Sequence, residues 1–228
     1  MNWMHFSDQL IKWVYLILKL TGIWWLFNSP YAFLGAVLLL VHDPSSVHSV
    51  FITSVALLPF VAIPALVAML ATARRYGRDD RSFSFLKSFW SYYRRDYKKS
   101  IILGGVNTGM LILFYFASRY YAELSSLLTA VFYLLLFVTP FFFLLVYSFL
   151  VDQQLSLKTY FSNTIFLSLK HPLNTLLMIM DIVVAIFLMW KIFPPLLVLV
   201  LPGLVALVTT HFYQKSMDTE IRKQQPSA

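Results

Sequence analysis

Residues 126–151 read SLLTAVFYLLLFVTPFFFLLVYSFLV, and this stretch decides the fold class. It contains no charged side chain. It is also longer than the roughly 20 apolar residues that a helix needs to cross the hydrocarbon core of a bilayer. The sequence therefore predicts a membrane-spanning helix at this position.

The composition of the whole chain supports the same class. Its 228 residues are 59% hydrophobic and only 12% charged, whereas about a quarter of the residues of an ordinary soluble domain are charged. Ten acidic and eighteen basic residues are too few to cover a soluble globule of 26.4 kDa. Because there is no cysteine, a disulfide framework and a cysteine-ligated metal site are excluded. We expect one integral membrane domain over residues 1–228.

Five further stretches are long and apolar enough to span a bilayer, which gives six predicted transmembrane helices in an all-α bundle. They cover residues 13–41, 50–72, 101–118, 173–190 and 193–213. The first is interrupted by Asn28-Ser29-Pro30. Prolines in the helix interior are expected to kink the helices at Pro30, Pro59, Pro64, Pro140 and Pro202.

The distribution of lysine and arginine predicts the orientation. Sixteen of the 18 basic residues fall on one side of these six spans, and nine of them lie between the second and third spans. Because positive loops stay in the cytoplasm, both termini are expected to be cytoplasmic. The loops at about 73–100 and 152–171 and the tail 214–228 are expected on the same side. The net charge of +8 then reflects topology and anionic lipid headgroups, and we expect no nucleic-acid partner.

The first cytoplasmic loop has an aromatic stripe with a period of four residues. This spacing predicts an amphipathic interfacial helix, with rings at headgroup depth and cations toward lipid phosphates or a protein partner. Phe85, Phe89, Tyr93 and Tyr97 form the stripe, and Lys87, Trp90, Arg94, Arg95, Lys98 and Lys99 surround it.

The second cytoplasmic loop resembles the first at an offset of 71 residues. Residues 86–91 (LKSFWS) align with residues 157–162 (LKTYFS), and Lys99 aligns with Lys170. We therefore expect a second interfacial helix with Lys158, Tyr160 and Phe161 as partner- or lipid-binding residues. The pattern predicts a parallel internal repeat, and coincidence in an aromatic-rich chain is the alternative.

Asp181 lies in the middle of the fifth predicted span. An intramembrane carboxylate costs about 3 kcal/mol on insertion scales, so Asp181 is expected to face the bundle. It then serves either as a proton or substrate site or as a structural hydrogen-bonding group. Asn174 shares its helical face, and Asn107 in the third span completes a candidate polar site. The small pair Gly105 and Gly109 is expected to permit close helix packing inside the bundle, and dimerisation through this pair is the alternative.

No catalytic constellation is visible in the sequence. There is no metalloprotease signature, no nucleophile elbow, no paired carboxylates and no nucleotide-binding fingerprint. His42, Asp43 and His48 lie on one outer loop, where three dispersed ligands are a weak metal signal. We expect no metal, no cofactor and no enzymatic activity, and a membrane enzyme acting on lipid or polysaccharide is the weakest alternative.

A set of short elements resembles the YesL-like family of small bacterial integral membrane proteins. They are residues 26–30 (LFNSP), 63–66 (IPAL), Arg74-Arg75, 85–90 (FLKSFW) and 97–100 (YKKS). The resemblance covers about residues 10 to 215. This sequence departs from many members of the family in its longer region between Pro30 and Pro64. The family resemblance therefore does not define the shape of the outer face.

The resemblance carries a functional implication. Genes of this family frequently lie beside those of carbohydrate ABC importers, which implies an accessory or assembly role with such an importer in the bacterial cell membrane. The basic aromatic loops are then the expected contact surface for importer subunits. The alternative hypothesis is an autonomous small-solute transporter with a midplane site at Asp181.

Overall fold

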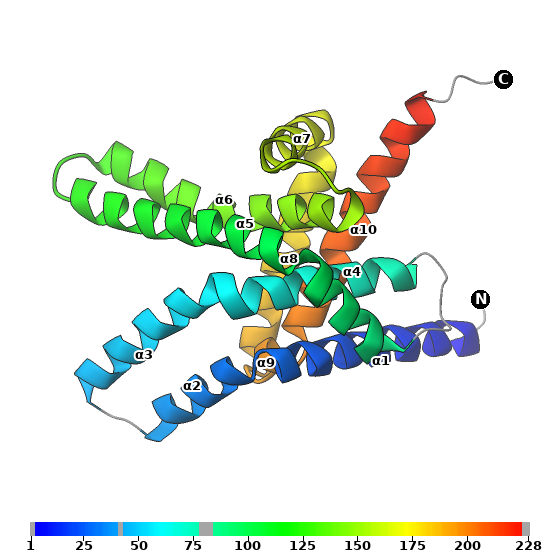
Figure 1. Ribbon diagram of the computed structural model, residues 1–228, viewed down its shortest axis with the longest axis horizontal. Coiled ribbons are helices and arrows are strands. Elements are labelled where there is room, and N and C mark those ends of the chain that lie inside the picture. Colours follow the sequence, from blue (N-terminus) through cyan, green and yellow to red (C-terminus); the bar gives the residue numbers. More distant parts are fainter. Residues whose placement is uncertain (1–2, 41–42, 78–83, 225–228) are drawn as a thin grey trace.

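The computed structural model describes residues 3–40, 43–77 and 84–224, and in these ranges every regular element is helical. The helices, labelled in Figure 1, are α1 (Trp3–Phe27), α2 (Ser29–Leu40), α3 (Pro44–Leu57), a π-helical turn η1 (Leu58–Ala62), α4 (Ile63–Gly77), α5 (Phe85–Tyr121), α6 (Ser126–Asp152), α7 (Leu157–Lys170), α8 (Pro172–Ile192), α9 (Leu196–Leu199) and α10 (Leu201–Gln224). The predicted all-α class is confirmed.

Four helical segments of the described chain are long and apolar enough to cross a membrane. They are Pro44–Gly77, Phe85–Tyr121, Ser126–Asp152 and Pro172–Ile192. A fifth span results if the bent pair formed by α1 and α2 is counted as one. These long apolar helices are compatible with a multi-pass membrane protein, whereas the predicted number of six spans is not confirmed.

The first predicted span is broken where the sequence indicated. Trp13–Phe27 and Ser29–Leu40 meet at an angle of 80°. The residue between them, Asn28, is fully buried, and its Nδ2 donates to the carbonyl oxygen of Trp24 over 2.9 Å. Pro30 follows in the first turn of α2, where its missing N–H is tolerated. The interruption is therefore a sharp corner in the chain.

The second span runs without interruption through α3, η1 and α4. Pro59 lies at the start of the π-helical turn, where the ladder of hydrogen bonds widens by one residue. The kink predicted at Pro59 thus takes the form of a local π-turn. Gly104 of α5 approaches this turn closely, because a Cβ atom at Gly104 would lie 3.1 Å from the Cα atom of Pro59.

The third span is longer than predicted. Residues 85–121 form one continuous helix of 37 residues, so the first cytoplasmic loop is not a separate interfacial helix. Within this range the sequence has no proline, and the change from basic to apolar side chains at Ser100 does not interrupt the backbone. The expectation of a separate helix is therefore wrong for the first loop.

The fourth and fifth spans agree closely with α6 and α8, but the sixth does not form one helix. Residues 193–213 are divided between α9 and α10, with a break at Val200 before Pro202. Just after this break α10 lies against α1, where the backbone N–H of Gly203 donates to Thr21 Oγ1 over 3.0 Å.

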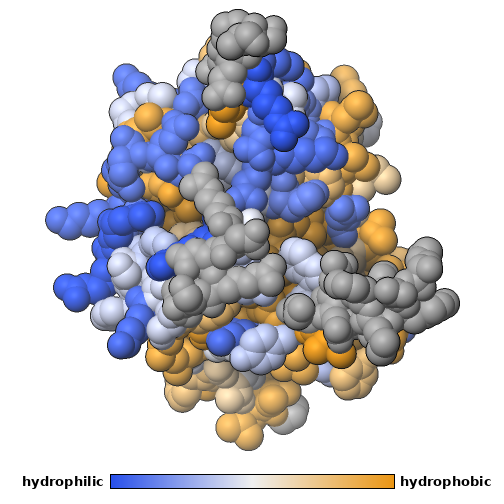
Figure 2. Space-filling model, turned by 90° about the vertical axis from the view of Figure 1, so that its right-hand side faces the viewer, coloured by the Kyte–Doolittle hydropathy of each residue, from blue (hydrophilic) through white to orange (hydrophobic). Residues whose placement is uncertain are grey.

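The helices bring the polar ends of several spans together at one end of the molecule. The ends of α4 and α10 and the start of α1 lie on the right in Figure 1, opposite the turns α2–α3 and α5–α6. Hydrophilic side chains gather over the upper and left parts of this end, as Figure 2 shows, while apolar side chains lie below them. The core between the helices includes the fully buried Phe89, Phe143, Tyr147, Tyr160 and Tyr213.

Candidate functional site

The aromatic stripe of α5 packs inside the protein. Phe89 is fully buried, and its ring centroid lies 4.6 Å from that of Phe27 in α1. The ring of Tyr93 lies 5.1 Å from the same Phe27 ring. Phe85 is also buried, and Lys19 Nζ of α1 lies 4.3 Å from its ring centroid. The expectation that these rings face lipid or a partner is therefore wrong for Phe85 and Phe89, which join α5 to α1.

The opposite side of the same helical segment forms an exposed basic stripe, defined here as Lys87, Trp90, Arg94 and Lys98. All four side chains are exposed, and Trp90 has an exposed fraction of 49%. Trp90 stacks on Tyr93 at an interplanar angle of 6°, and the Arg94 guanidinium lies 5.9 Å from the Trp90 ring. Residues three, four and seven apart share one helical face. The stripe is thus a continuous surface carrying three positive charges.

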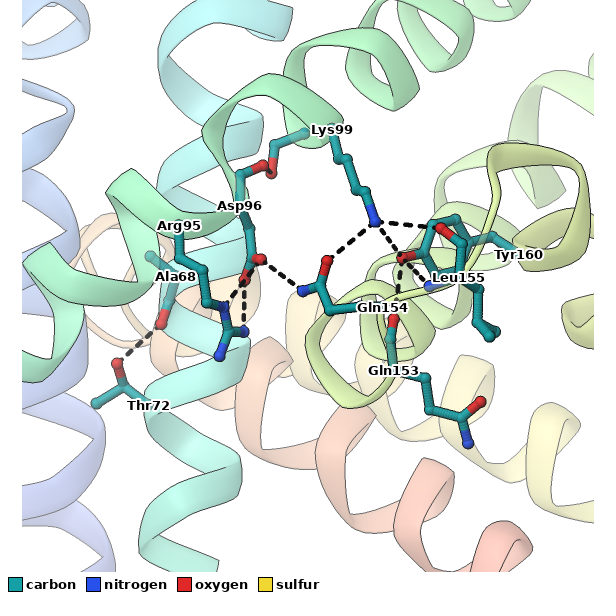
Figure 3. A network of polar contacts seen from close by, with 10 residues as sticks. Ala68, Thr72, Arg95, Asp96, Lys99, Gln153, Gln154, Leu155 and Tyr160 are labelled. Atoms are coloured by element: carbon teal, nitrogen blue, oxygen red, sulfur yellow. Dashed lines mark hydrogen bonds and ion pairs between the residues drawn. The ribbon is translucent and has the colours of Figure 1, made fainter.

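Next to the basic stripe, α5 is connected to the segment after α6 by a buried carboxylate, shown in Figure 3. Asp96 is only 2% exposed. It accepts hydrogen bonds from Arg95 Nε at 3.0 Å and Arg95 Nη2 at 2.6 Å. Gln154 Nε2 donates to the same carboxylate over 3.2 Å. Arg95, predicted as a contact residue, therefore serves first to neutralise an internal acid.

The two loops that resemble each other in sequence meet at Lys99. Its Nζ donates to Gln154 Oε1 over 2.9 Å, to the Leu155 carbonyl oxygen over 3.1 Å and to Tyr160 Oη over 3.4 Å. Tyr160 is fully buried, accepts from the Leu155 N–H and donates to the Gln153 carbonyl oxygen, both over 2.9 Å. Lys99 and Tyr160 thus hold the α6–α7 turn against α5.

One pair of residues that corresponds in the predicted repeat is placed similarly in the structure. Phe89 and Tyr160, which correspond at the offset of 71, are both fully buried near the start of α5 and α7. The two segments differ after these positions, because α5 continues past Ser100 whereas α7 ends at Lys170. Lys158 is exposed and Phe161 is half-buried against Phe143 at 5.7 Å. The internal repeat itself stays a prediction.

A second polar cluster, which the sequence analysis did not identify, joins α4, α6 and α10. Arg74 pairs with Asp152, and their side chains are 9% and 16% exposed. Tyr213 Oη donates to Asp152 Oδ2 over 2.9 Å. The sequence did contain a signal for this pair. Arg74 lies at the end of one predicted span and Asp152 at the end of another, and both ends were predicted on the cytoplasmic side.

A third cluster fixes α10 to the α7–α8 corner. Glu220 accepts from Lys170 Nζ at 2.9 Å, contacts His171 Nε2 at 2.9 Å and accepts from Lys223 Nζ at 3.0 Å. One turn below, Asn174 Nδ2 donates to Ser216 Oγ over 2.9 Å. Asn174, expected at an intramembrane site, therefore belongs to this helix junction.

A cavity of about 650 Å³ lies between α1, α4, α5, α6, α8 and α10, and its walls are mainly apolar. Asn107 and Tyr147 form its polar side, where Asn107 Nδ2 donates to Tyr147 Oη over 3.0 Å. Three buried polar atoms of lining residues have no hydrogen-bond partner within the described chain: Trp24 Nε1, Asn107 Oδ1 and Thr108 Oγ1. These atoms offer both donors and acceptors to a molecule in the cavity.

Asp181 does not line this cavity. Its side chain is exposed, whereas its neighbour Ile182 is buried and forms part of the cavity wall. The expectation that Asp181 faces the bundle is therefore wrong, because the α8 face that packs inward carries Met178 and Ile182 instead. Asn107 is the predicted polar residue that does line this cavity.

Two other expectations concern small residues and the outer loop. A Cβ atom at Gly105 or Gly109 would meet nothing within 4 Å, so the expected internal packing of this pair is wrong, and the neighbouring Gly104 makes the close contact. Asp43 is the N-cap of α3, where it accepts from the Ser46 N–H over 2.9 Å. His42 lies outside the described residues.

The fold is that of an all-α protein with several helices long enough to span a bilayer. Residues 13–117 match a family model described as "Protein of unknown function, DUF624". The matched segment includes most of α1, the basic stripe and Asn107, and it ends near the end of α5. No curated protein and no solved structure matches the chain.

Proposed function

We propose that this chain is a non-enzymatic, YesL-like multi-pass protein of the bacterial cell membrane. In this proposal it acts as an accessory or assembly subunit of a carbohydrate ABC importer. The observation that carries the proposal is the exposed basic stripe formed by Lys87, Trp90, Arg94 and Lys98. Its cations and indole ring are solvent-exposed, while the neighbouring aromatic residues Phe85 and Phe89 are used for internal packing.

The rigidity of the stripe supports a docking role. Its four residues lie on one uninterrupted helix, which is fixed to α1 by Phe27 and to the α6–α7 turn by Lys99. A surface held in place before binding loses little conformational entropy on association. Tryptophan and arginine are also enriched among the residues that contribute most to protein interfaces. An acidic surface on a cytoplasmic or membrane partner fits this chemistry.

The exposed face of α8 supports a second contact inside the membrane. Among the described residues of α8 only Met178 and Ile182 are buried, and Asp181 lies exposed between them in the sequence. A carboxylate facing lipid is costly, by about 3 kcal/mol on insertion scales. A partner helix that brings a donor or a cation to Asp181 would remove this cost. The accessory role therefore explains why an acid is tolerated on this face.

The importer is proposed from family resemblance. The elements that carry the YesL-like resemblance include residues 85–90, and the DUF624 match over residues 13–117 contains them. The genomic neighbourhood implied by that family then favours subunits of a sugar importer as the partner.

Affinity purification of the intact protein in mild detergent, followed by mass spectrometry, tests the proposal. Importer subunits should be recovered with the wild type, and the double variant Lys87→Gln/Arg94→Gln should reduce the recovery. The matched control is Lys215→Gln/Arg222→Gln, which removes the same charge from exposed positions of α10. Isolation of the chain alone after crosslinking in intact cells, or equal losses in both double variants, would contradict the proposal.

The cavity beside Asn107 favours a second candidate, an autonomous small-solute transporter. Its volume of about 650 Å³ falls in the range of small-molecule sites. Its lining residues Asn107, Thr108 and Trp24 each carry a buried polar atom without a hydrogen-bond partner in the described chain. The polar centre is then Asn107 with Tyr147, in place of Asp181. Uptake of labelled mono- or disaccharides by proteoliposomes of the purified chain, lost in Asn107→Leu and retained in Asp181→Asn, would favour this candidate over the accessory role.

A further inference from the structure

A pocket of about 420 Å³ opens at the polar end of the molecule between α4, α5 and α6. Three arginines, Arg74, Arg75 and Arg95, line it together with Tyr92 and Asp152. We propose that this arginine pocket binds a phosphate group, carried either by a lipid headgroup or by a small soluble molecule. The inference is independent of the partner-binding role, because the basic stripe does not line the pocket.

Arg74 gives the most direct support for an anion site. Its side chain is 9% exposed, and one amino group, Nη2, pairs with Asp152. The other two nitrogens, Nε and Nη1, are buried without a hydrogen-bond partner in the part of the chain that the structure describes. Because a guanidinium group stays charged at physiological pH, it cannot reduce this cost by losing a proton. A ligand with several acceptor oxygens would satisfy these donors.

Arg75 and Arg95 add donors on other sides of the same pocket. Arg75 Nη1 donates to the hydroxyl group of Ser88 over 3.2 Å. Arg95 uses Nε and Nη2 for Asp96, so within the described residues these hydrogen bonds do not engage Nη1. The Arg95 guanidinium lies 5.0 Å from the Tyr92 ring, which restricts its orientation. Arginines in a fixed geometry are suited to phosphate because two N–H groups match two phosphate oxygens.

The two acidic side chains next to the pocket do not oppose an anion. Asp152 presents Oδ1 to Arg74 and Oδ2 to the Tyr213 hydroxyl group. Asp96 is held by Arg95 at both oxygens and by Gln154 at one of them. Each carboxylate is therefore surrounded by donors.

The position of the pocket is compatible with both sources of phosphate. Arg74 and Arg75 occupy the last turn of α4, and Asp152 is the last residue of α6, so the pocket lies where two apolar spans end. A headgroup phosphate reaches this depth from the bilayer, and a soluble phosphate ester reaches it from the aqueous side. Inorganic phosphate and phosphatidic acid carry the same chemical group and separate the two sources experimentally.

The test measures binding of each probe to the purified full-length protein in a neutral detergent. Inorganic phosphate is titrated by calorimetry, and dioleoylphosphatidic acid in mixed micelles is followed by native mass spectrometry and by the shift in melting temperature. Arg75→Gln should weaken binding by about 10-fold or more, since a hydrogen bond to a charged group contributes about 1.5–3 kcal/mol. Arg94→Gln, which removes one charge from the basic stripe outside the pocket, should have little effect.

The outcomes are distinct. Binding of inorganic phosphate that depends on Arg75 identifies a soluble ligand, whereas binding of phosphatidic acid alone with the same dependence identifies a lipid headgroup. Absence of binding by both probes overturns the proposal, as does an equal weakening by Arg75→Gln and Arg94→Gln. Because Arg74→Gln removes a buried ion pair and risks misfolding, Arg95→Lys is the second variant. It keeps the charge but lacks the planar fork, and it should weaken phosphate binding while the protein stays folded.

Discussion

The hydroxyl group of Tyr213 donates to Asp152 Oδ2 over 2.9 Å, and the other oxygen of the same carboxylate pairs with Arg74. These three side chains come from α10, α6 and α4, so one carboxylate joins three helices at the polar end of the molecule. The Arg74 guanidinium also lies 5.9 Å from the Tyr213 ring. The helices are thus held together by charge and hydrogen bonding at the point where their apolar contacts end.

We expect Asp152→Asn to destabilise the protein by about 3 kcal/mol. The substitution keeps the shape of the side chain but leaves the Arg74 charge buried without its counter-charge, and breaking a buried pair costs about 3–5 kcal/mol. The lower value applies because Asp152 retains 16% exposure. Unfolding by heat or denaturant in detergent micelles measures the change. Asp218→Asn, at an exposed position of the same polar end, is the control, and equal stability of the two variants would contradict the assignment.

Tyr160→Phe should loosen the α6–α7 turn. The buried hydroxyl group accepts from the Leu155 N–H and donates to the Gln153 carbonyl oxygen, and an orphaned buried polar group costs about 1–3 kcal/mol. Hydrogen exchange at the Leu155 amide should become faster in the variant. Tyr133→Phe removes a hydroxyl group from a half-exposed ring of α6 and should leave that exchange rate unchanged. Unaltered protection of Leu155 in Tyr160→Phe would exclude this role.

Two glycine substitutions separate a tight contact from an open position. In Gly203→Ala the new Cβ atom would lie 2.5 Å from the Ile17 carbonyl oxygen and 2.7 Å from Thr21 Oγ1. Because the nearest atom belongs to the backbone of α1, the helices must separate, at a cost of about 1–3 kcal/mol. Gly105→Ala meets nothing within 4 Å and should be neutral or stabilising. A melting temperature lowered by both substitutions to the same extent would contradict the contact.

The Glu220 cluster gives the protein a stability component that depends on pH. Hydrogen bonds from Lys170 and then Lys223 lower the pKa of the Glu220 carboxyl group from 4.5 to about 2. A carboxyl group with a lowered pKa stabilises the folded state above its ordinary value, and this contribution is lost as pH falls from about 4.5 to about 2. The difference in melting temperature between wild type and Glu220→Gln should therefore decrease as pH falls from about 4.5 to about 2. A difference that does not change with pH would contradict the role of these hydrogen bonds.

The apolar spans were predictable where the hydrophobic run and the helix end together. Residues 126–151 and 173–190 agree with α6 and α8 to within two residues at each end, because charged or proline residues flank both runs. The start of α5 was not predictable from hydropathy. A helix continues through a change from polar to apolar side chains as long as its backbone hydrogen bonds are satisfied, and residues 85–121 contain no proline.

The candidate site was predictable in part. The cations at Lys87, Arg94 and Lys98 are exposed as expected, since charged groups on a helix avoid burial. The aromatic residues of the same segment were assigned to the wrong side, because a stripe with a period of four residues fits a membrane interface and a protein interior equally well. Only the position of α1, whose Phe27 ring packs against Phe89 and Tyr93, decides between the two environments.

The length of α5 has a consequence for the way this helix fits a bilayer. Its 37 residues extend over about 55 Å at 1.5 Å per residue, whereas the hydrocarbon core is about 30 Å thick. A helix of this length does not fit inside the hydrocarbon core, so in a membrane part of α5 extends past the apolar layer. The charged segment from Lys87 to Lys99 is the part suited to the headgroups and the water beyond them.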